Sequence, residues 1–287
     1  MSKSLLYALL CVVLWAFIPV ASKEALKNLN NFSFLFFSNL ISAAVMFIYL
    51  LSQRKSLKLN SPTEYAFLTF LGFLGSFAYY VLLYKAFSLS TAQEIFIINY
   101  SWPILIVALS IPILKESISA VKIVSILVSF FGVLIIASKG NPFKLNFTSI
   151  TGDMLSFAGA LCFALFSVLG KKNKTDPEVA VFYYFLSASV FSLFTLPLFR
   201  IESLDTNTLF WTFINGAFIN GISYIFWFKA LKSGETSLIS NTVYLTPFVS
   251  LVFISIFLGE KIHFYSLFAL LFIVGGILLQ SFKRFTY

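Results

Sequence analysis

Residues 72–132 include the segments GFLGSFAYYVLLYKA (72–86) and NYSWPILIVALSIPILKE (99–116), and the landmarks of this stretch return 144 positions later in the chain. The repeated landmarks are glycine, aromatic, basic, proline and acidic residues: Gly72 and Gly216, Tyr80 and Tyr224, Lys85-Ala86 and Lys229-Ala230, Tyr100 and Tyr244, Pro103 and Pro247, Glu116 and Glu260, Gly132 and Gly276. Seven landmarks in one register indicate an internal duplication. A weaker register of 148 positions relates the preceding segments, where Lys23 corresponds to Lys171.

The composition is that of an integral membrane protein. Of the 287 residues, 59% are hydrophobic and 11% are charged, and the mean hydropathy is +0.93. Soluble domains carry about 25% charged residues. A net charge of +9 could indicate nucleic-acid binding in a soluble protein, but here Lys and Arg lie in short runs between apolar segments. Because membrane topology explains such runs, we expect a lipid bilayer as the surroundings and no nucleic-acid partner.

A helix needs about 20 apolar residues to cross a bilayer, and the sequence contains ten such runs. They are residues 5–21, 32–51, 65–84, 95–114, 120–138, 154–170, 179–199, 209–228, 237–258 and 264–281. The longest connection, Lys139–Gly152, is the natural seam between the halves. We therefore expect an all-α integral membrane fold in which ten transmembrane helices form two inverted five-helix repeats, at residues 1–140 and 151–287.

The distribution of basic residues predicts the orientation. With the N-terminus inside, the inner segments carry 13 of the 20 Lys and Arg residues, which favours cytoplasmic N- and C-termini in the plasma membrane. Since each repeat has an odd number of spans, the second copy must enter the membrane from the opposite side. Inverted repeats of this kind support alternating access, with a substrate site near the bilayer midplane.

Polar and ring-bearing side chains recur at equivalent positions of the two repeats and predict the cavity wall. Residues four apart share a helix face, and the substrate-binding candidates found in this way are Ser76, Tyr80, Tyr100, Asn220, Tyr224, Trp227, Asn241 and Tyr244. The alternative is that these side chains only bond one helix to another. Asn99 and Trp102, beside Pro103, face either the cavity or a neighbouring helix.

Four further features of the sequence bear on mechanism and packing. Glu94, at the head of the fourth run, is a candidate for proton coupling, or else it stabilises a helix N-terminus. Pro103 and Pro247 lie in duplicated spans and are hinge candidates, because proline removes a backbone donor. The acidic landmarks after these spans are interpreted as structural groups, and the glycine landmarks of the fifth and tenth spans indicate close packing or a dimer contact.

The sequence offers little for catalysis. Cys11 and Cys162 lie in apolar runs, and the single histidine, His263, starts a helix at the interface. We therefore expect no metal site, no cofactor, no nucleotide-binding loop and no enzyme activity.

The ten spans, the first helix with Trp15 and the doubled Lys-Ala, Pro and Glu pattern resemble the drug/metabolite transporter superfamily, and within it the exporters built from two EamA domains. The resemblance implies a central cavity with roles for Trp15, Tyr80, Trp102, Tyr224, Asn241 and Tyr244. It also implies that the fifth and tenth spans lie at the periphery, often at a homodimer contact. Phe163 stands where the first repeat has Trp15, which leaves the substrate open.

The expected function is secondary-active transport of a small metabolite by alternating access, with export of an amino acid or an amino-acid derivative as the leading hypothesis. The predicted cavity is rich in rings and amides, which suit an apolar side chain beside ammonium and carboxylate groups. The alternative is uptake or exchange of a nucleoside-type metabolite such as S-adenosylmethionine, whose adenine ring could stack on Trp and Tyr.

Overall fold

The structure, a computed structural model, describes residues 2–144 and 147–282, except for the side chains of residues 92, 93, 281 and 282. The α-helices of this part of the chain are α1 (Lys3–Trp15), α2 (Ile18–Ala25), α3 (Asn31–Ser52), α4 (Pro62–Gly72), α5 (Tyr79–Phe87), α6 (Ala92–Asn99), α7 (Trp102–Leu114), α8 (Ala120–Ala137), α9 (Ile150–Lys172), α10 (Pro177–Ser192), α11 (Thr206–Ile214), α12 (Ser223–Ser233), α13 (Thr236–Thr242), α14 (Leu245–Leu258) and α15 (Phe264–Phe282). Two π-helices, η1 (Phe73–Ala78) and η3 (Asn215–Ile222), and one 3₁₀-helix, η2 (Leu193–Leu198), continue the spans.

Within the described residues, nine helical spans are long and apolar enough to cross a bilayer, and Phe264–Gln280 is a shorter apolar helix at the position of the tenth predicted run. This confirms the predicted all-α membrane fold. Successive spans run in opposite directions. We call the side on which α1 begins, at Lys3, the N-terminal face, and the side on which α2 ends, at Ala25, the distal face.

Several helix starts are fixed by polar caps. Asn30 Oδ1 accepts a hydrogen bond from the Ser33 amide (3.0 Å), and Asp205 Oδ1 accepts one from the Thr208 amide (2.7 Å). Each bond satisfies a backbone donor that has no partner within the helix. The Thr208 amide and hydroxyl also hold the pKa of the Asp205 carboxyl below its usual value.

The two repeats are inverted about an axis at which equivalent residues meet. The Tyr244 hydroxyl donates to the Tyr100 carbonyl (3.2 Å), and the Ser129 hydroxyl donates to the Ile273 carbonyl (3.1 Å). Both contacts join residues 144 positions apart. Contact between a residue and its own equivalent is what a two-fold relation produces at its axis. The bounds 1–140 and 151–287 stay predictions, and residues 283–287, with the predicted side of the C-terminus, lie outside the described residues.

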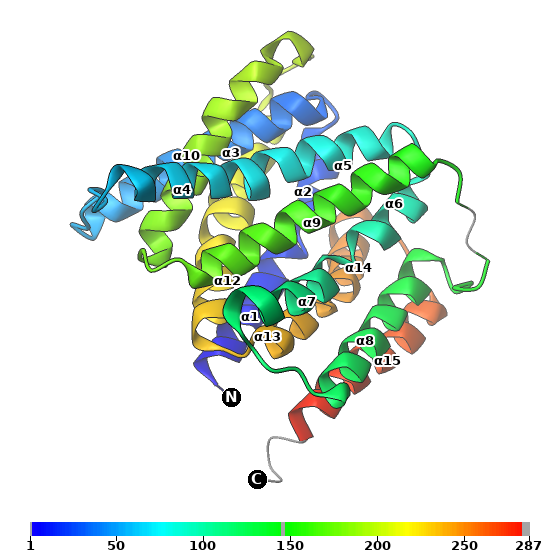
Figure 1. Cartoon of the computed structure of the whole chain (residues 1–287). Coiled ribbons are helices and arrows are strands. Elements are labelled where there is room, and N and C mark those ends of the chain that lie inside the picture. Colours follow the sequence, from blue (N-terminus) through cyan, green and yellow to red (C-terminus); the bar gives the residue numbers. More distant parts are fainter. Residues whose placement is uncertain (1, 145–146, 283–287) are drawn as a thin grey trace.

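The fifth and tenth spans, α8 and α15, pack side by side at the edge of the molecule (Figure 1). Glycine permits this close approach. A Cβ added at Gly132 would lie 2.6 Å from Ile273 Cγ1, and one added at Gly276 would lie 2.5 Å from the Ser125 carbonyl oxygen. The duplicated glycines therefore serve packing within the chain.

Replacing Gly276 with alanine is expected to destabilise the protein by about 1–3 kcal/mol, because the new methyl group overlaps the backbone of α8. The matched control is Gly275→Ala, since no atom lies within 4 Å of a Cβ at that position. Alanine there should leave stability unchanged or raise it slightly. Thermal unfolding of the two purified variants compares them, and equal unfolding temperatures would contradict the close packing.

Three spans are interrupted where proline follows the break. The first span breaks between α1 and α2, with Pro19 in the first turn of α2. The fourth breaks between α6 and α7, with Pro103 in the first turn of α7. The ninth breaks between α13 and α14, with Pro247 as the third residue of α14. Proline is tolerated in a first turn, because its missing donor would be unpaired there anyway. The duplicated prolines thus mark paired helix breaks, and their role as hinges stays a prediction.

The third and eighth spans contain the two π-helices at equivalent positions. η1 follows Gly72, and η3 includes Gly216, which is the repeat equivalent of Gly72. A Cβ at Gly72 would overlap the backbone of Tyr184 in α10, and one at Gly216 would overlap Ile41 in α3. A π-helix bonds residue i to i+5, so it shifts the faces of the helix relative to a regular α-helix.

Candidate functional site

A cavity of about 660 Å³ lies between the two repeats. Its wall reaches Ser22, Phe87 and Lys139 near the distal ends of α2, α5 and α8, and Phe87 and Lys139 are exposed. Trp15, Trp102 and Phe163, in the middle of their spans, form its inner end. The cavity therefore opens toward the distal face and ends near the middle of the membrane. Its size is within the range of small-molecule sites.

The inner end is a cluster of rings around Trp15. The Trp15 ring centroid lies 5.3 Å from that of Trp227, 5.7 Å from that of Tyr224 and 6.0 Å from that of Trp102. Trp102 and Phe163 also meet edge to face, at 4.9 Å. Such tilted and edge-on contacts are the favourable geometries for aromatic pairs. The cluster separates the cavity from the N-terminal face.

The structure places six of the ten substrate-binding candidates on the cavity wall: Trp15, Tyr80, Tyr100, Trp102, Asn220 and Tyr224. The side chains of Tyr80 and Tyr224, which are repeat equivalents, interact with each other there. Their role in substrate binding stays a prediction.

The other four candidates lie behind the wall. Trp227 is buried, and its indole Nε1 donates to Ser167 Oγ (3.1 Å). Asn241 Nδ2 donates to Gln280 Oε1 (3.2 Å), and Tyr244 donates to the Tyr100 carbonyl. Ser76 is buried within η1, whose π-helical turn changes the face that a spacing of four residues would share with Tyr80.

Several lining residues were not identified from the sequence. Tyr79 lines the cavity, and its hydroxyl accepts a hydrogen bond from Asn99 Nδ2 (3.2 Å). Asn215 Nδ2 donates to Ser38 Oγ (2.9 Å) on another part of the wall. Thr246 lies on the wall directly before Pro247. Its position directly before a duplicated proline was the available signal for Thr246, whereas Asn99, near Pro103, was named from the sequence with its side left open.

The wall carries little charge. Among its lining residues, all of which the structure describes, Lys139 is the only one with a charged side chain, and it lies at the mouth. The remaining polar groups are hydroxyls and amides. A wall of this kind favours a substrate with no large net charge, because buried charges require a counter-charge.

Glu94 does not line the cavity. It accepts hydrogen bonds from the Thr148 amide and the Thr148 hydroxyl (both 2.8 Å), and from the Ser90 hydroxyl. Thr91 caps α6 and accepts from the Glu94 amide (3.3 Å). Thr91 is thus a side-chain N-cap of α6, and Glu94, in the first turn, lies where a negative charge stabilises a helix start. The proton-coupling role of Glu94 stays a prediction.

An ion pair crosses the distal face near the cavity mouth. Lys23 Nζ lies 2.7 Å from Glu260 Oε1, and both side chains are 55% exposed. Lys23 follows the lining residue Ser22, and Glu260 follows the distal end of α14, whose residues also line the cavity. The pair joins the first repeat to the second.

The equivalent ion pair lies on the N-terminal face and is more buried. Lys171 Nζ donates to Glu116 Oε1 (2.7 Å), to Thr236 Oγ1 (2.7 Å) and to the Gly234 carbonyl (3.0 Å). The side chains of Lys171 and Glu116 are 15% and 25% exposed. Lys171 and Glu116 are the repeat equivalents of Lys23 and Glu260, so the same pair occurs on both faces.

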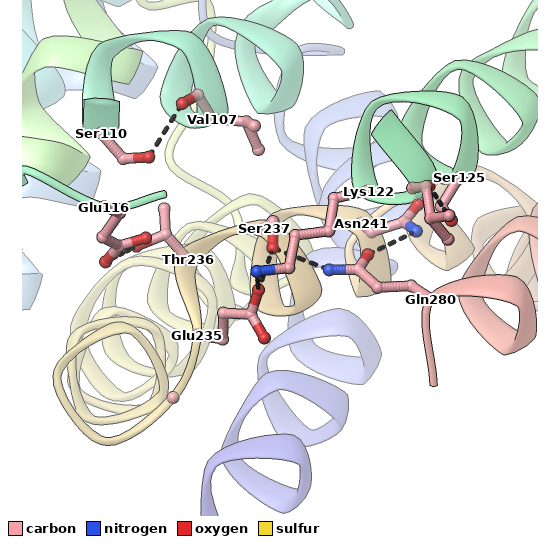
Figure 2. A network of polar contacts seen from close by, with 12 residues as sticks. Val107, Ser110, Glu116, Lys122, Ser125, Glu235, Thr236, Ser237, Asn241 and Gln280 are labelled. Carbon is pink, nitrogen blue, oxygen red and sulfur yellow. Dashed lines mark hydrogen bonds and ion pairs between the residues drawn. The ribbon is translucent and has the colours of Figure 1, made fainter. Parts of the chain in front are cut away.

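Further polar contacts join the two repeats across the N-terminal face (Figure 2). Lys122 of the first repeat pairs with Glu235 of the second, and Ser237 donates to Glu235 (2.7 Å). Gln280 Nε2 then donates to Ser237 Oγ (2.7 Å), and Asn241 donates to Gln280. The N-terminal face is therefore closed by a network of contacts, whereas the Lys23–Glu260 pair at the cavity mouth is exposed.

Comparisons with known proteins agree with this architecture. A family model described as the EamA-like transporter family matches residues 2–138 and 150–282. An uncharacterized transporter of Archaeoglobus fulgidus is 24% identical over 99% of both chains. The uncharacterized transporter YyaM of Bacillus subtilis is 25% identical over 84% of this chain and 81% of its own. One crystal structure of a protein superposes with a TM-score of 0.87 at 20% identity, covering 99% of this chain and 98% of that chain, and this likeness concerns the fold.

Proposed function

The chain belongs to the EamA-like transporter family, and from that premise we propose that it is a secondary-active carrier that moves a small metabolite by alternating access. The cavity between the repeats is the proposed substrate site. Trp15, Tyr80, Tyr100, Trp102, Asn220 and Tyr224 are the proposed contact residues. The plasma membrane, with the N-terminus in the cytoplasm, is the proposed location.

The observation that carries this proposal is the occurrence of one ion pair twice, on opposite faces. Lys171–Glu116 is shielded and has two additional hydrogen bonds from the lysine, whereas Lys23–Glu260 is exposed at the mouth of the cavity. Breaking an exposed pair costs about 0–1 kcal/mol, while breaking a shielded and hydrogen-bonded pair costs more, because a buried charge is left without its partner. The described conformation is thus strongly closed on one side and weakly bridged on the other.

Exchange of the conformations of the two repeats would reverse this arrangement. The Lys23–Glu260 side would then become the shielded one, and the cavity would open toward the N-terminal face. Inverted repeats have this property because each half can adopt the conformation of the other. Alternating access therefore needs only two conformations of the five-helix repeat, which the two repeats adopt in turn.

An amino acid or an amino-acid derivative is the proposed cargo, with export as the proposed direction. The rings of the wall suit an apolar side chain, and its amides and hydroxyls suit a compact polar group. Flux assays with purified protein in liposomes test the proposal. Amino acids loaded inside the liposomes should be released down an imposed gradient or exchange with external amino acids. S-adenosylmethionine is tested in the same way as the nucleoside-type alternative. Flux of neither class would contradict the assigned cargo.

Replacing Tyr80 with alanine is expected to reduce amino-acid flux at least tenfold while folded protein remains in the membrane. Tyr80 is only half-buried and packs mainly against Tyr79 (4.7 Å) and Tyr84 (5.9 Å), so its loss affects the wall more than the core. The matched control is Tyr49→Ala, because Tyr49 is 37% exposed and does not line the cavity. Equal flux in both variants would place the substrate elsewhere.

A further inference from the structure

Two buried side chains on the cavity wall carry an oxygen atom that has no hydrogen-bond partner among the described residues. Asn99 is 7% exposed, and its Nδ2 donates to the Tyr79 hydroxyl, but its Oδ1 is unpaired. Thr246 is 6% exposed, and its hydroxyl oxygen is unpaired. Both residues line the cavity. Buried polar atoms without a partner destabilise a protein, so they are rare and call for a reason.

The two residues lie at the paired helix breaks. Asn99 is the last residue of α6, and Thr246 is the second residue of α14. The breaks are joined by the hydrogen bond from the Tyr244 hydroxyl to the Tyr100 carbonyl (3.2 Å). Tyr100 directly follows Asn99, and Tyr244 precedes Thr246 by two residues. Both unpaired atoms therefore belong to residues at the interrupted helices, at the depth where carriers of this construction bind substrates.

We propose that Asn99 and Thr246 form a head-group subsite that binds the ammonium and carboxylate groups of a zwitterionic substrate. This inference rests on the carrier function proposed above and specifies the chemistry of its site. The Asn99 amide oxygen accepts a hydrogen bond from the ammonium group, and the Thr246 hydroxyl donates one to the carboxylate. If the Asn99 amide is flipped, its free nitrogen donates a hydrogen bond to the carboxylate, and the Thr246 hydroxyl oxygen accepts one from the ammonium group. Either orientation complements both charges.

The surroundings of the subsite favour a zwitterion over a singly charged substrate. Among the lining residues that the structure describes, Lys139 is the only one with a charged side chain, it lies at the exposed mouth, and none carries a carboxylate. A buried ion would lack a counter-charge at this depth, whereas a zwitterion carries its own. The aromatic lining of the cavity, which includes Tyr79, Tyr80 and Phe96, can accommodate the apolar side chain.

The test compares Thr246→Val and Asn99→Ala in the full chain with the control Thr242→Val. Thr242 is fully buried one turn before Thr246, but its hydroxyl donates to the Leu238 carbonyl (2.8 Å) and it does not line the cavity. The probes are L-phenylalanine, phenethylamine without the carboxylate, and 3-phenylpropionate without the ammonium group. Thermal unfolding of purified protein should show at least tenfold tighter binding of phenylalanine than of either analogue. Thr246→Val and Asn99→Ala should abolish this preference, and Thr242→Val should keep it.

A ligand-free measurement separates a binding role from a structural one. Thr246→Val removes an unpaired hydroxyl and should leave the unfolding temperature equal or raise it, whereas Thr242→Val removes a paired hydroxyl and should lower it. A decrease for Thr246→Val equal to that for Thr242→Val would overturn the subsite, as would a retained preference for phenylalanine in both wall variants. Wild-type protein that binds all three probes equally keeps the carrier and overturns the subsite. Wild-type protein that binds none of them contradicts the amino-acid cargo and the zwitterion assignment together.

Discussion

Glu116→Gln is expected to open the N-terminal face and to increase the reactivity of Cys11 toward thiol reagents at least tenfold. The substitution keeps the shape of the side chain but leaves Lys171, which is 15% exposed, without its counter-charge. Loss of one partner of a buried pair costs about 3–5 kcal/mol, and the partial exposure of this pair lowers the expected cost to about 1–3 kcal/mol. A change of 1.4 kcal/mol shifts a two-state population about tenfold.

Cys11 is a native reporter for this opening. It is fully buried in α1, one helical turn before Trp15 and on the same face, so it lies between the inner end of the cavity and the N-terminal face. Labelling from the N-terminal face of oriented vesicles, with Cys162 replaced by serine, follows its exposure. The matched control is Glu260→Gln, which removes the equivalent carboxylate from the exposed pair on the distal face and should not accelerate the labelling.

A charge-swap variant tests whether faster labelling comes from loss of the ion pair itself. The double variant Glu116→Lys with Lys171→Glu restores the ion pair with opposite polarity, so it should return Cys11 labelling toward the wild-type rate. Unchanged labelling in Glu116→Gln, in protein that stays folded by gel filtration, would show that this pair does not hold the N-terminal face closed.

Glu178→Gln is expected to lower the free energy of unfolding by about 2 kcal/mol. Glu178 is buried at the start of α10, where its two oxygens lie 2.5 Å from Lys229 Nζ and 2.5 Å from Lys55 Nζ. Its side chain is 6% exposed, while each lysine is about one third exposed, which places the cost below that of a fully buried pair. Lys55 belongs to the first repeat and Glu178 to the second, so the substitution weakens the contact between repeats.

Thermal or denaturant unfolding in detergent measures this effect. Glu24→Gln is the control, because Glu24 pairs on the distal face with Lys27, which is 58% exposed, and such a pair should contribute less than about 1 kcal/mol. Equal stability of the two variants would contradict the structural role of Glu178.

The membrane fold was predictable from the sequence because its determinants are local. Apolar run length fixes the spans, and an odd number of spans per repeat fixes the inversion. The duplicated landmarks also predicted that Tyr80 and Tyr224 are equivalent, and the structure brings them together on one wall. These features depend on spacing and hydrophobicity alone.

The details of the wall depend on irregular helix geometry, which spacing does not reveal. The prediction placed Ser76 and Tyr80 on one face by assuming an α-helix, but η1 alters the phase and brings Tyr79 to the wall while Ser76 is buried. The ion pairs were hidden for another reason. Glu116 and Lys171 are far apart in the chain, so their pairing depends on how the two repeats dock.

The most direct test of the central claim is to measure the widths of both faces in the same population of molecules. Spin labels at the exposed positions 27 and 261 report the distal face, and labels at 117 and 172 report the N-terminal face. With a transported amino acid in excess, pulsed electron spin resonance should give two distances for each pair, and the population that narrows distally should equal the population that widens on the N-terminal face. Both pairs widening together, or one fixed distance for each pair during active transport, would contradict reciprocal exchange of the two repeats.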